Sequence, residues 1–221
     1  MSDAVSAAGE SRTLPPNLLP EDQARADFYA LLAALYASGP DRGLLASIAR
    51  APDLGLPTFI DRGPAKSLEL AAAWDALRAA SAVMPAEAAE QEYVDLFVGV
   101  GKSEVNLHGS HWLTGFMMDR PLAEVRQTLA TLGLQRKPEA DLVEDHVSAL
   151  CETMRLLIAG GTGFAPVDAA TQQRFFAAHI EPWIERCTAA IGAHAIANYY
   201  RRVAQFTECF MALERESLVI D

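Results

Sequence analysis

Apolar side chains recur along this chain with the spacing of one helical face. The stripe nearest the N-terminus has offsets of 0, 3, 4, 7 and 8, and its members are Phe28, Leu31, Leu32, Leu35 and Tyr36. The most regular stripe has offsets of 0, 4, 7, 8, 11, 14 and 15, and its members are Val143, Val147, Leu150, Cys151, Met154, Leu157 and Ile158. No stretch alternates with a period of two over the length of a strand. The pattern therefore predicts an all-α fold.

Glycine and proline positions divide these stripes into separate helices, because glycine costs backbone entropy in a helix and proline removes a hydrogen bond. Gly39-Pro40 ends the first helix, and Gly133 closes a later one. We expect Ser110 to cap a short helix and Pro182 to kink a long one. Helices are expected over about 21–38, 41–50, 65–84, 86–98, 110–118, 121–132, 143–158, 168–190 and 193–216. The prediction is a single globular bundle of about eight to ten helices.

The ends and the middle of the chain suggest its domain organisation. Residues 1–20 are polar and contain several prolines, so we expect a disordered tail there and a helical domain over 21–221. The connector 133–142 is a candidate hinge between halves spanning 21–132 and 143–221. Halves joined in this way can exchange between subunits, so a monomer and a domain-swapped homodimer both stay open.

The net charge of the chain limits the classes of partner that it can bind. Eighteen basic and 29 acidic residues give a net charge of −11, which repels nucleic acid and anionic membranes and attracts basic peptides. Acidity that serves solubility alone is the alternative reading.

The three cysteines have no Cys-x-x-Cys spacing, and an odd number argues against a disulfide framework. With no apolar run of about 20 residues for a membrane span and no secretory leader in residues 1–17, we expect a cytoplasmic protein without stable membrane insertion.

Two groups of histidines and acids are the candidates for metal chemistry. His108 and His111 lie three residues apart, and Glu144-Asp145-His146 forms a second group. If the groups met in space they would suit zinc or iron, and a helical metal-dependent enzyme using His108, His111, Asp145 and His146 is the alternative function. Neither group has the spacing that places two ligands on one helical face. Glu144 and Asp145 could equally be acids that favour the first turn of a helix.

Aromatic residues around Gly99 suggest a binding surface of another kind. Tyr93 and Phe97 precede this helix stop and Trp112 follows it. Exposed aromatic rings beside acidic groups would suit a peptide that is both basic and hydrophobic. The alternative is that Tyr93 and Phe97 belong to the core of an amphipathic helix. Neither a Walker-type phosphate loop nor a Gly-x-Ser-x-Gly elbow occurs in the chain.

Three short segments resemble the motifs of the TorD/DmsD/NarJ family of molybdoenzyme maturation chaperones. The family's Glu-x-x-x-Leu-Phe element is similar to residues 92–97, and its following Pro-Tyr-x-Ser-x-Tyr element is similar to residues 107–112. Its Glu-Pro-x-Asp-His element is similar to residues 142–146, and the likeness extends from about Glu21 to the C-terminus. The segment from Ser110 to Pro121 looks closest to members associated with formate dehydrogenase.

The resemblance implies a chaperone that is not an enzyme and carries no metal or cofactor. Such a protein binds the leader peptide or the apo form of a molybdopterin oxidoreductase subunit, of the formate dehydrogenase, TMAO reductase or DMSO reductase type. It assists cofactor insertion before twin-arginine export. The implied peptide-binding residues are Tyr93, Leu96, Phe97, Ser110, Trp112, Glu144, Asp145 and His146. We expect Asp145 and Glu144 to face the arginines of the leader, and Tyr93, Leu96, Phe97 and Trp112 to receive its apolar part.

Overall fold

A computed structural model describes residues 18–55, 65–99, 101–136 and 141–218. Within these ranges the chain forms ten α-helices, one π-helical turn and no strand, which confirms the all-α prediction. The elements are α1 (Pro20–Ala37), α2 (Arg42–Arg50), α3 (Ala65–Val83), α4 (Ala86–Tyr93), η1 (Val94–Val98), α5 (Gly109–Thr114), α6 (Arg120–Thr131), α7 (Val147–Ala159), α8 (Ala169–His179), α9 (Glu181–Ala193) and α10 (Tyr199–Ser217). Most of the expected tail, and residues 137–140 of the expected connector, lie outside the described residues.

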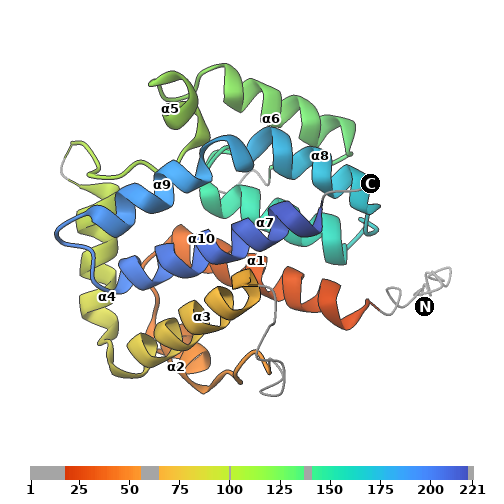
Figure 1. Ribbon diagram of the computed structural model, residues 1–221. Helices are drawn as coiled ribbons and strands as arrows, with labels where there is room; N and C mark the ends of the chain where they lie inside the picture. The colour runs from red at the N-terminus through yellow and green to blue at the C-terminus, as the bar shows by residue number, and fades with distance from the viewer. Residues whose placement is uncertain (1–17, 56–64, 100, 137–140, 219–221) are drawn as a thin grey trace, which may run out of the picture.

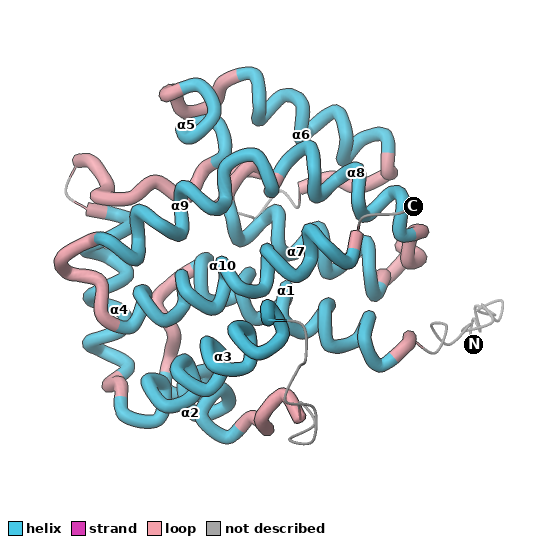
Figure 2. The backbone as a smooth tube through the Cα atoms, in the orientation of Figure 1, coloured by secondary structure: helices cyan, strands magenta, loops and turns pink. Residues whose placement is uncertain are grey.

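The C-terminal helix α10 runs through the middle of the bundle (Figure 1). It packs against α3 on one side and against α9 on the other, and α2 covers the outer side of α3. The first helix, α1, packs along α7, which in turn contacts α8. Helices α5 and α6 form the edge of the molecule opposite to α2 and α3, at the top of Figure 1. Loops join the helices at the periphery (Figure 2).

A single core of aromatic and aliphatic side chains joins the two expected halves. Its fully buried large residues come from both sides of the connector, and they include Tyr29, Tyr36, Leu77, Phe175, Trp183, Tyr199, Tyr200, Phe206 and Phe210. Burying a side chain of this size contributes roughly 1.5–3 kcal/mol. Because α1 packs on α7 and α3 packs on α10, each half supplies part of the other's core. The proposed hinge at 133–142 stays a prediction.

Local sequence signals place many of the helix ends. The side chains of Asp41, Asp119 and Asp168 each accept a hydrogen bond from a backbone N–H in the first turn of the following helix. Gly133 has a φ of +74°, which closes α6 as predicted. At Gly99, which ends η1 with a φ of +64°, a Cβ atom would lie 2.2 Å from the carbonyl oxygen of Lys102. These ends are fixed by short-range chemistry, so the sequence predicts them.

Four predicted helices differ from the observed ones. The helix expected over 110–118 is α5, which already ends at Thr114 because Gly115 adopts a left-handed φ of +83°. The helix expected from 143 begins at Val147, because His146 caps it. The kink expected at Pro182 is a break at Ile180 that separates α8 from α9. The last helix begins at Tyr199, several residues later than expected.

A buried ion pair ties the first described helix to the last. Arg25 on α1 donates from Nε and Nη2 to the two carboxylate oxygens of Glu214 on α10, at 2.7 and 3.0 Å. Glu214 is 2% exposed, and Arg25 also donates to Asp22. Removing one partner of such a pair would leave an uncompensated buried charge. None of the described helices is long and apolar enough to cross a membrane.

Candidate functional site

Two of the motif segments, 107–112 and 142–146, lie far apart in the sequence and meet in space. The backbone N–H of Gly109 donates to the carbonyl of Asp145 at 2.9 Å, and the N–H of Val147 donates to the carbonyl of Leu107 at 2.9 Å. These bonds pair His108 with His146 in a short antiparallel bridge. We call residues 107–112 and 143–147 the junction. It holds α5 against the segment that leads into α7.

The carboxylate of Asp145 fastens the junction from inside. Its Oδ2 accepts hydrogen bonds from the backbone N–H of Ser110 at 2.9 Å and from the Ser110 hydroxyl at 2.5 Å. Asp145 is 2% exposed and Ser110 is fully buried. Charge-assisted hydrogen bonds of this kind are stronger than neutral ones. Ser110 therefore binds Asp145 from within the first turn of α5, and the expectation that it caps the helix is wrong.

His146 begins α7 as its N-cap. Its Nδ1 accepts a hydrogen bond from the backbone N–H of Ser148 at 3.1 Å. Burial, with a smaller contribution from His108, lowers the pKa of His146 to about 3, so the ring is neutral at pH 7. Glu144 and Asp145 consequently precede the helix, and the expectation that they occupy its first turn is wrong.

His108 packs against His146 across the junction, with ring centroids 4.8 Å apart. Its Nδ1 lies 3.1 Å from Oδ1 of Asn106. Burial lowers the pKa of His108, although the nearby charge of Asp145 acts in the opposite direction. At pH 7 both rings are uncharged, and they fill the junction as packing groups.

The candidate metal donors do not form a metal centre in the described parts of the chain. Nowhere in these parts are three or more His, Cys, Asp or Glu side chains grouped so that they could hold an ion. Of the predicted set, Asp145 is bonded to Ser110, and His146 accepts from Ser148. The ring of His111 packs edge to face with that of the neighbouring Trp112, with centroids 5.8 Å apart. These contacts give the donors other partners than a metal.

Glu144 has a different environment from its neighbour Asp145. Its side chain is 11% exposed, and its Oε2 accepts from Nε of Arg126 on α6 at 3.0 Å. Nε of Arg136 lies 3.9 Å from the other carboxylate oxygen. The two arginine side chains are 52% and 37% exposed. A shielded carboxylate is thus held by two guanidinium groups that reach it from the surface.

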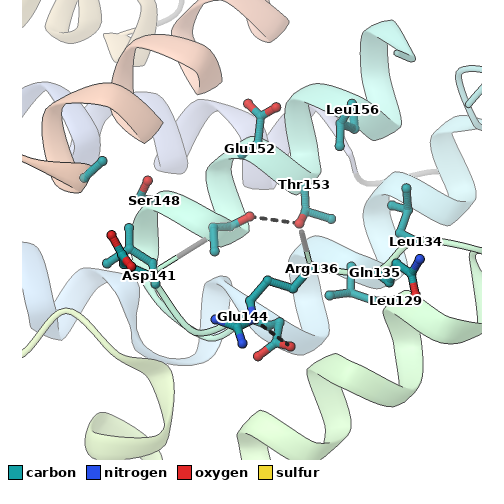
Figure 3. Close-up of a pocket in the computed structure, with 13 residues that line it drawn as sticks. Leu129, Leu134, Gln135, Arg136, Asp141, Glu144, Ser148, Glu152, Thr153 and Leu156 are labelled. Atoms are coloured by element: carbon teal, nitrogen blue, oxygen red, sulfur yellow. Dashed lines mark hydrogen bonds and ion pairs between the residues drawn. The ribbon is translucent and has the colours of Figure 1, made fainter. Parts of the chain in front are cut away.

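A pocket of about 550 Å³ opens beside Glu144 (Figure 3). Its walls come from the end of α6, the segments flanking residues 137–140, the first turns of α7, and Ala37 at the end of α1. Leucines supply most of the apolar lining, namely Leu129, Leu134, Leu142 and Leu156. Asp141, Glu144 and Glu152 supply acidic groups, and Arg136 supplies a basic one beside Glu144. Pockets of this size, apolar with a few polar groups, are typical of ligand sites.

The aromatic part of the predicted site packs against the C-terminal end of α1. Leu96 is fully buried, whereas Tyr93 and Phe97 are half-buried against the core. The Tyr93 hydroxyl donates to the carbonyl oxygens of Tyr36 and Ala37, at 3.2 and 3.0 Å. Because Ala37 also lines the pocket, this aromatic group supports the helix end that forms one pocket wall.

Trp112 stands at the surface end of the junction. Its Nε1 donates to the carbonyl of Asn106 at 2.8 Å, and the guanidinium of Arg186 lies 6.0 Å from its ring centroid. The ring is half-buried. In the same segment, Gly109 leaves little room for a side chain, because a Cβ there would lie 3.0 Å from Nε1 of Trp183. The glycine lets α5 approach α9 closely.

The structure therefore divides the predicted residues into three places. Ser110, Asp145 and His146 meet in the junction, with Trp112 at its edge. Glu144 alone lines the pocket. Tyr93, Leu96 and Phe97 form a third group that packs against Tyr36 and Tyr200. The carboxylate of Asp145 is enclosed, so only Glu144 of the acidic pair is accessible from the pocket in this conformation.

Sequence reasoning did not identify three residues that matter here. Glu92, in the first motif, accepts hydrogen bonds from the backbone N–H groups of Asn198, Tyr199 and Tyr200 at 2.8–3.0 Å and so caps α10. Its partners lie more than 100 residues away in the chain, so no local pattern signals them. Arg126 and Arg136, which hold Glu144, look like ordinary surface arginines in the sequence. In the sequence, only their positive charge, opposite to that of Glu144, indicates that they could pair with it.

Comparison with known protein families gives a match to part of the chain. The model of the family described as nitrate reductase delta subunit matches residues 64–189. The matched range contains all three motif segments, the whole junction and the pocket lining except Ala37. No curated protein matches the sequence significantly.

Proposed function

Because the chain belongs to the nitrate reductase delta subunit family, whose members are molybdoenzyme maturation chaperones, we propose that it is a cytoplasmic chaperone for a molybdopterin oxidoreductase subunit. It binds the leader peptide of that subunit, its apo form, or both, and assists cofactor insertion before twin-arginine export. The client is a subunit of the nitrate reductase, formate dehydrogenase, TMAO reductase or DMSO reductase type. The family is non-catalytic in general, and this chain likewise acts by binding.

The observation that carries this proposal is the pocket beside Glu144. It combines leucine walls with a shielded carboxylate that already binds guanidinium groups. A carboxylate and a guanidinium form charge-assisted, often bidentate hydrogen bonds. A peptide with arginines next to apolar residues therefore matches both parts of the pocket, and the net charge of −11 attracts it from a distance.

The predicted residues take separate roles in this proposal. Glu144 receives an arginine of the peptide, and the pocket leucines receive apolar side chains. Asp145, Ser110 and His146 hold the segment that presents Glu144. Tyr93 and Phe97 support the wall at Ala37 and extend the apolar surface with their exposed edges, together with Trp112. Leu96 contributes as a core residue.

Affinity capture from the cytosol of the native host tests the proposal. The full chain is used as bait in cells that express a molybdoenzyme, and bound proteins are identified by mass spectrometry. We expect enrichment of a molybdoenzyme catalytic subunit, with less of it on a Glu144→Gln bait. Repeating the capture after deletion of that subunit's leader locates the contact. Recovery of no molybdoenzyme subunit from cells shown to contain one would overturn the proposal.

A further inference from the structure

Glu144 is already occupied by guanidinium groups of its own chain. Arg126 donates to one carboxylate oxygen at 3.0 Å, and Arg136 approaches the other. Arg136 lines the pocket, whereas Arg126 reaches Glu144 from the exposed face of α6 and does not line it. The carboxylate is 11% exposed and so is poorly hydrated. The two arginines stand where the arginine of a ligand would have to bind.

We propose that Arg126 is an internal competitor for Glu144, which occupies the carboxylate in the empty pocket and is displaced by an arginine of the bound peptide. This inference rests on the proposed function, because it names the regulation of that same site. It makes the chain select peptides that carry an arginine, since only a guanidinium or a similar cation can replace the one that leaves. Arg136 stays in the pocket and continues to balance the carboxylate.

The environments of the two partners favour such an exchange. The Arg126 side chain is 52% exposed, so it can leave Glu144 and become hydrated at little cost. Glu144 is mostly shielded, so a conformation in which it keeps only the more distant Arg136 as its cation is less favourable. An apolar or acidic side chain in the pocket would leave the carboxylate without Arg126 and without a replacement. An arginine from a peptide restores the pair.

The release of Arg126 leaves the fold of α6 intact. The helix is anchored by its buried residues Pro121, Leu122, Val125 and Leu129. Its N-terminus is capped by Asp119. Among the described residues, the guanidinium of Arg126 pairs with Glu144. A substitution at Arg126 therefore changes the occupancy of Glu144 with little change in the helix.

A peptide titration tests the exchange. The probe is a fluorescent synthetic peptide with two adjacent arginines followed by a leucine-rich segment, compared with a copy in which both arginines are glutamine. It is titrated against the full-length wild-type chain, Arg126→Gln, Glu144→Gln and the control Arg120→Gln. Arg120 lies on the same helix, is exposed and pairs with Glu124, so the control makes the same change of charge outside the pocket.

We expect Arg126→Gln to bind the arginine peptide about 3- to 10-fold tighter than wild type, with Arg120→Gln at or near the wild-type affinity. Neither substitution should improve binding of the glutamine peptide. Glu144→Gln should bind the arginine peptide about 10-fold or more weakly and lose the preference for arginine. Thermal unfolding of each variant checks that the fold is retained.

The outcomes separate this inference from the proposed function. If the wild-type chain does not prefer the arginine peptide, the proposed use of the pocket fails. If wild type and Glu144→Gln behave as expected but Arg126→Gln binds no more tightly than Arg120→Gln, the competition alone is overturned. A second measurement needs no variant: the side-chain Nε–H signal of Arg126 in ¹⁵N NMR should lose its exchange protection when the peptide saturates the wild-type chain. Retained protection would also overturn the competition.

Discussion

Glu144 and Asp145 are neighbours in the sequence and lie in opposite kinds of environment. Asp145 is enclosed, and its partners are a backbone N–H and a hydroxyl that the fold holds in place. Glu144 faces a pocket, and its partners are the guanidinium groups of two partly exposed arginines. One short segment thus stabilises the fold through Asp145 and, in the proposed function, presents Glu144 to a ligand. The hydrogen-bond donors to Asp145 belong to the buried junction, whereas those to Glu144 are surface side chains that a ligand could replace.

The junction and the pocket also differ in what surrounds the carboxylate. In the junction the neighbouring groups are the packed rings of His108 and His146, and burial keeps both rings neutral at pH 7. In the pocket the neighbouring groups are leucines and further acids around an open space. Substitutions in the junction should therefore change stability, and substitutions in the pocket should change binding.

The largest expected effect comes from Asp145→Ala. It removes the acceptor of two hydrogen bonds and leaves the N–H and hydroxyl of Ser110 buried without a partner, so we expect a loss of about 3 kcal/mol in the free energy of unfolding. Urea denaturation measures this loss. Asp141→Ala, an exposed acid at the pocket, is the matched control and should change stability by less than about 0.5 kcal/mol. Equal effects at the two positions would contradict the comparison.

Acid should loosen the junction next. The pKa of His146 is about 3 in the folded chain and about 6.5 when unfolded, so below pH 6.5 the unfolded state binds a proton that the folded state does not. Stability must then fall as the pH falls, by up to about 1.4 kcal/mol per pH unit for this residue between about pH 6 and pH 3. His108 and His179, whose pKa values burial also lowers, act in the same direction.

His146→Asn isolates this contribution. Asparagine is a good N-cap residue and can accept from the N–H of Ser148, but it does not titrate. Unfolding free energies measured at pH 7 and pH 5 should differ less for this variant than for wild type. The same loss in both chains would remove His146 as the source of the pH dependence.

Glu92→Gln tests an enclosed carboxylate that lies far from the junction. Glu92 accepts three backbone hydrogen bonds at the start of α10, and glutamine keeps one acceptor oxygen but loses the charge. We expect a loss of about 1.5 kcal/mol in unfolding free energy with no change in peptide affinity. Hydrogen exchange of the first turn of α10 should accelerate. A variant that folds normally and yet loses peptide affinity would place Glu92 in the binding site.

The smallest effect on stability is expected for Glu144→Gln. Its arginine partners are about half exposed, so the ion pairs are screened by solvent and contribute less than about 1 kcal/mol. Denaturation of this variant should therefore resemble that of wild type. A loss as large as that of Asp145→Ala would mean that Glu144 also serves mainly to hold the fold.

The sequence predicts those parts of the molecule that depend on near neighbours. Periodicity predicts the helices, and single residues such as Asp41 and Gly133 predict where helices begin and end. The predicted start of α7 is too early, because Val143 is apolar and continues the stripe although it lies before the helix. Capping by His146 makes the helix begin only at Val147, and a histidine ring is a weak sequence signal for an N-cap.

The candidate site could be predicted only in part. The motif segments carry Ser110, Asp145 and His146, which the structure brings together in the junction. Their role in binding a peptide stays a prediction. Which carboxylate is enclosed depends on Ser110, which lies 35 residues away, and on packing that periodicity does not describe. The arginines on Glu144 are equally remote. Long-range partners decide whether an acid holds the fold or faces a ligand.

Hydrogen exchange of the wild-type chain, with and without a saturating peptide of two arginines and a leucine-rich segment, tests the central claim most directly. If the peptide binds in the pocket beside Glu144, backbone amides in residues 126–136 and 141–156 should become protected. Those in residues 42–50, which form α2 away from the pocket, should be unchanged. Protection confined to helices outside the pocket, under conditions where the peptide is bound, would contradict the account.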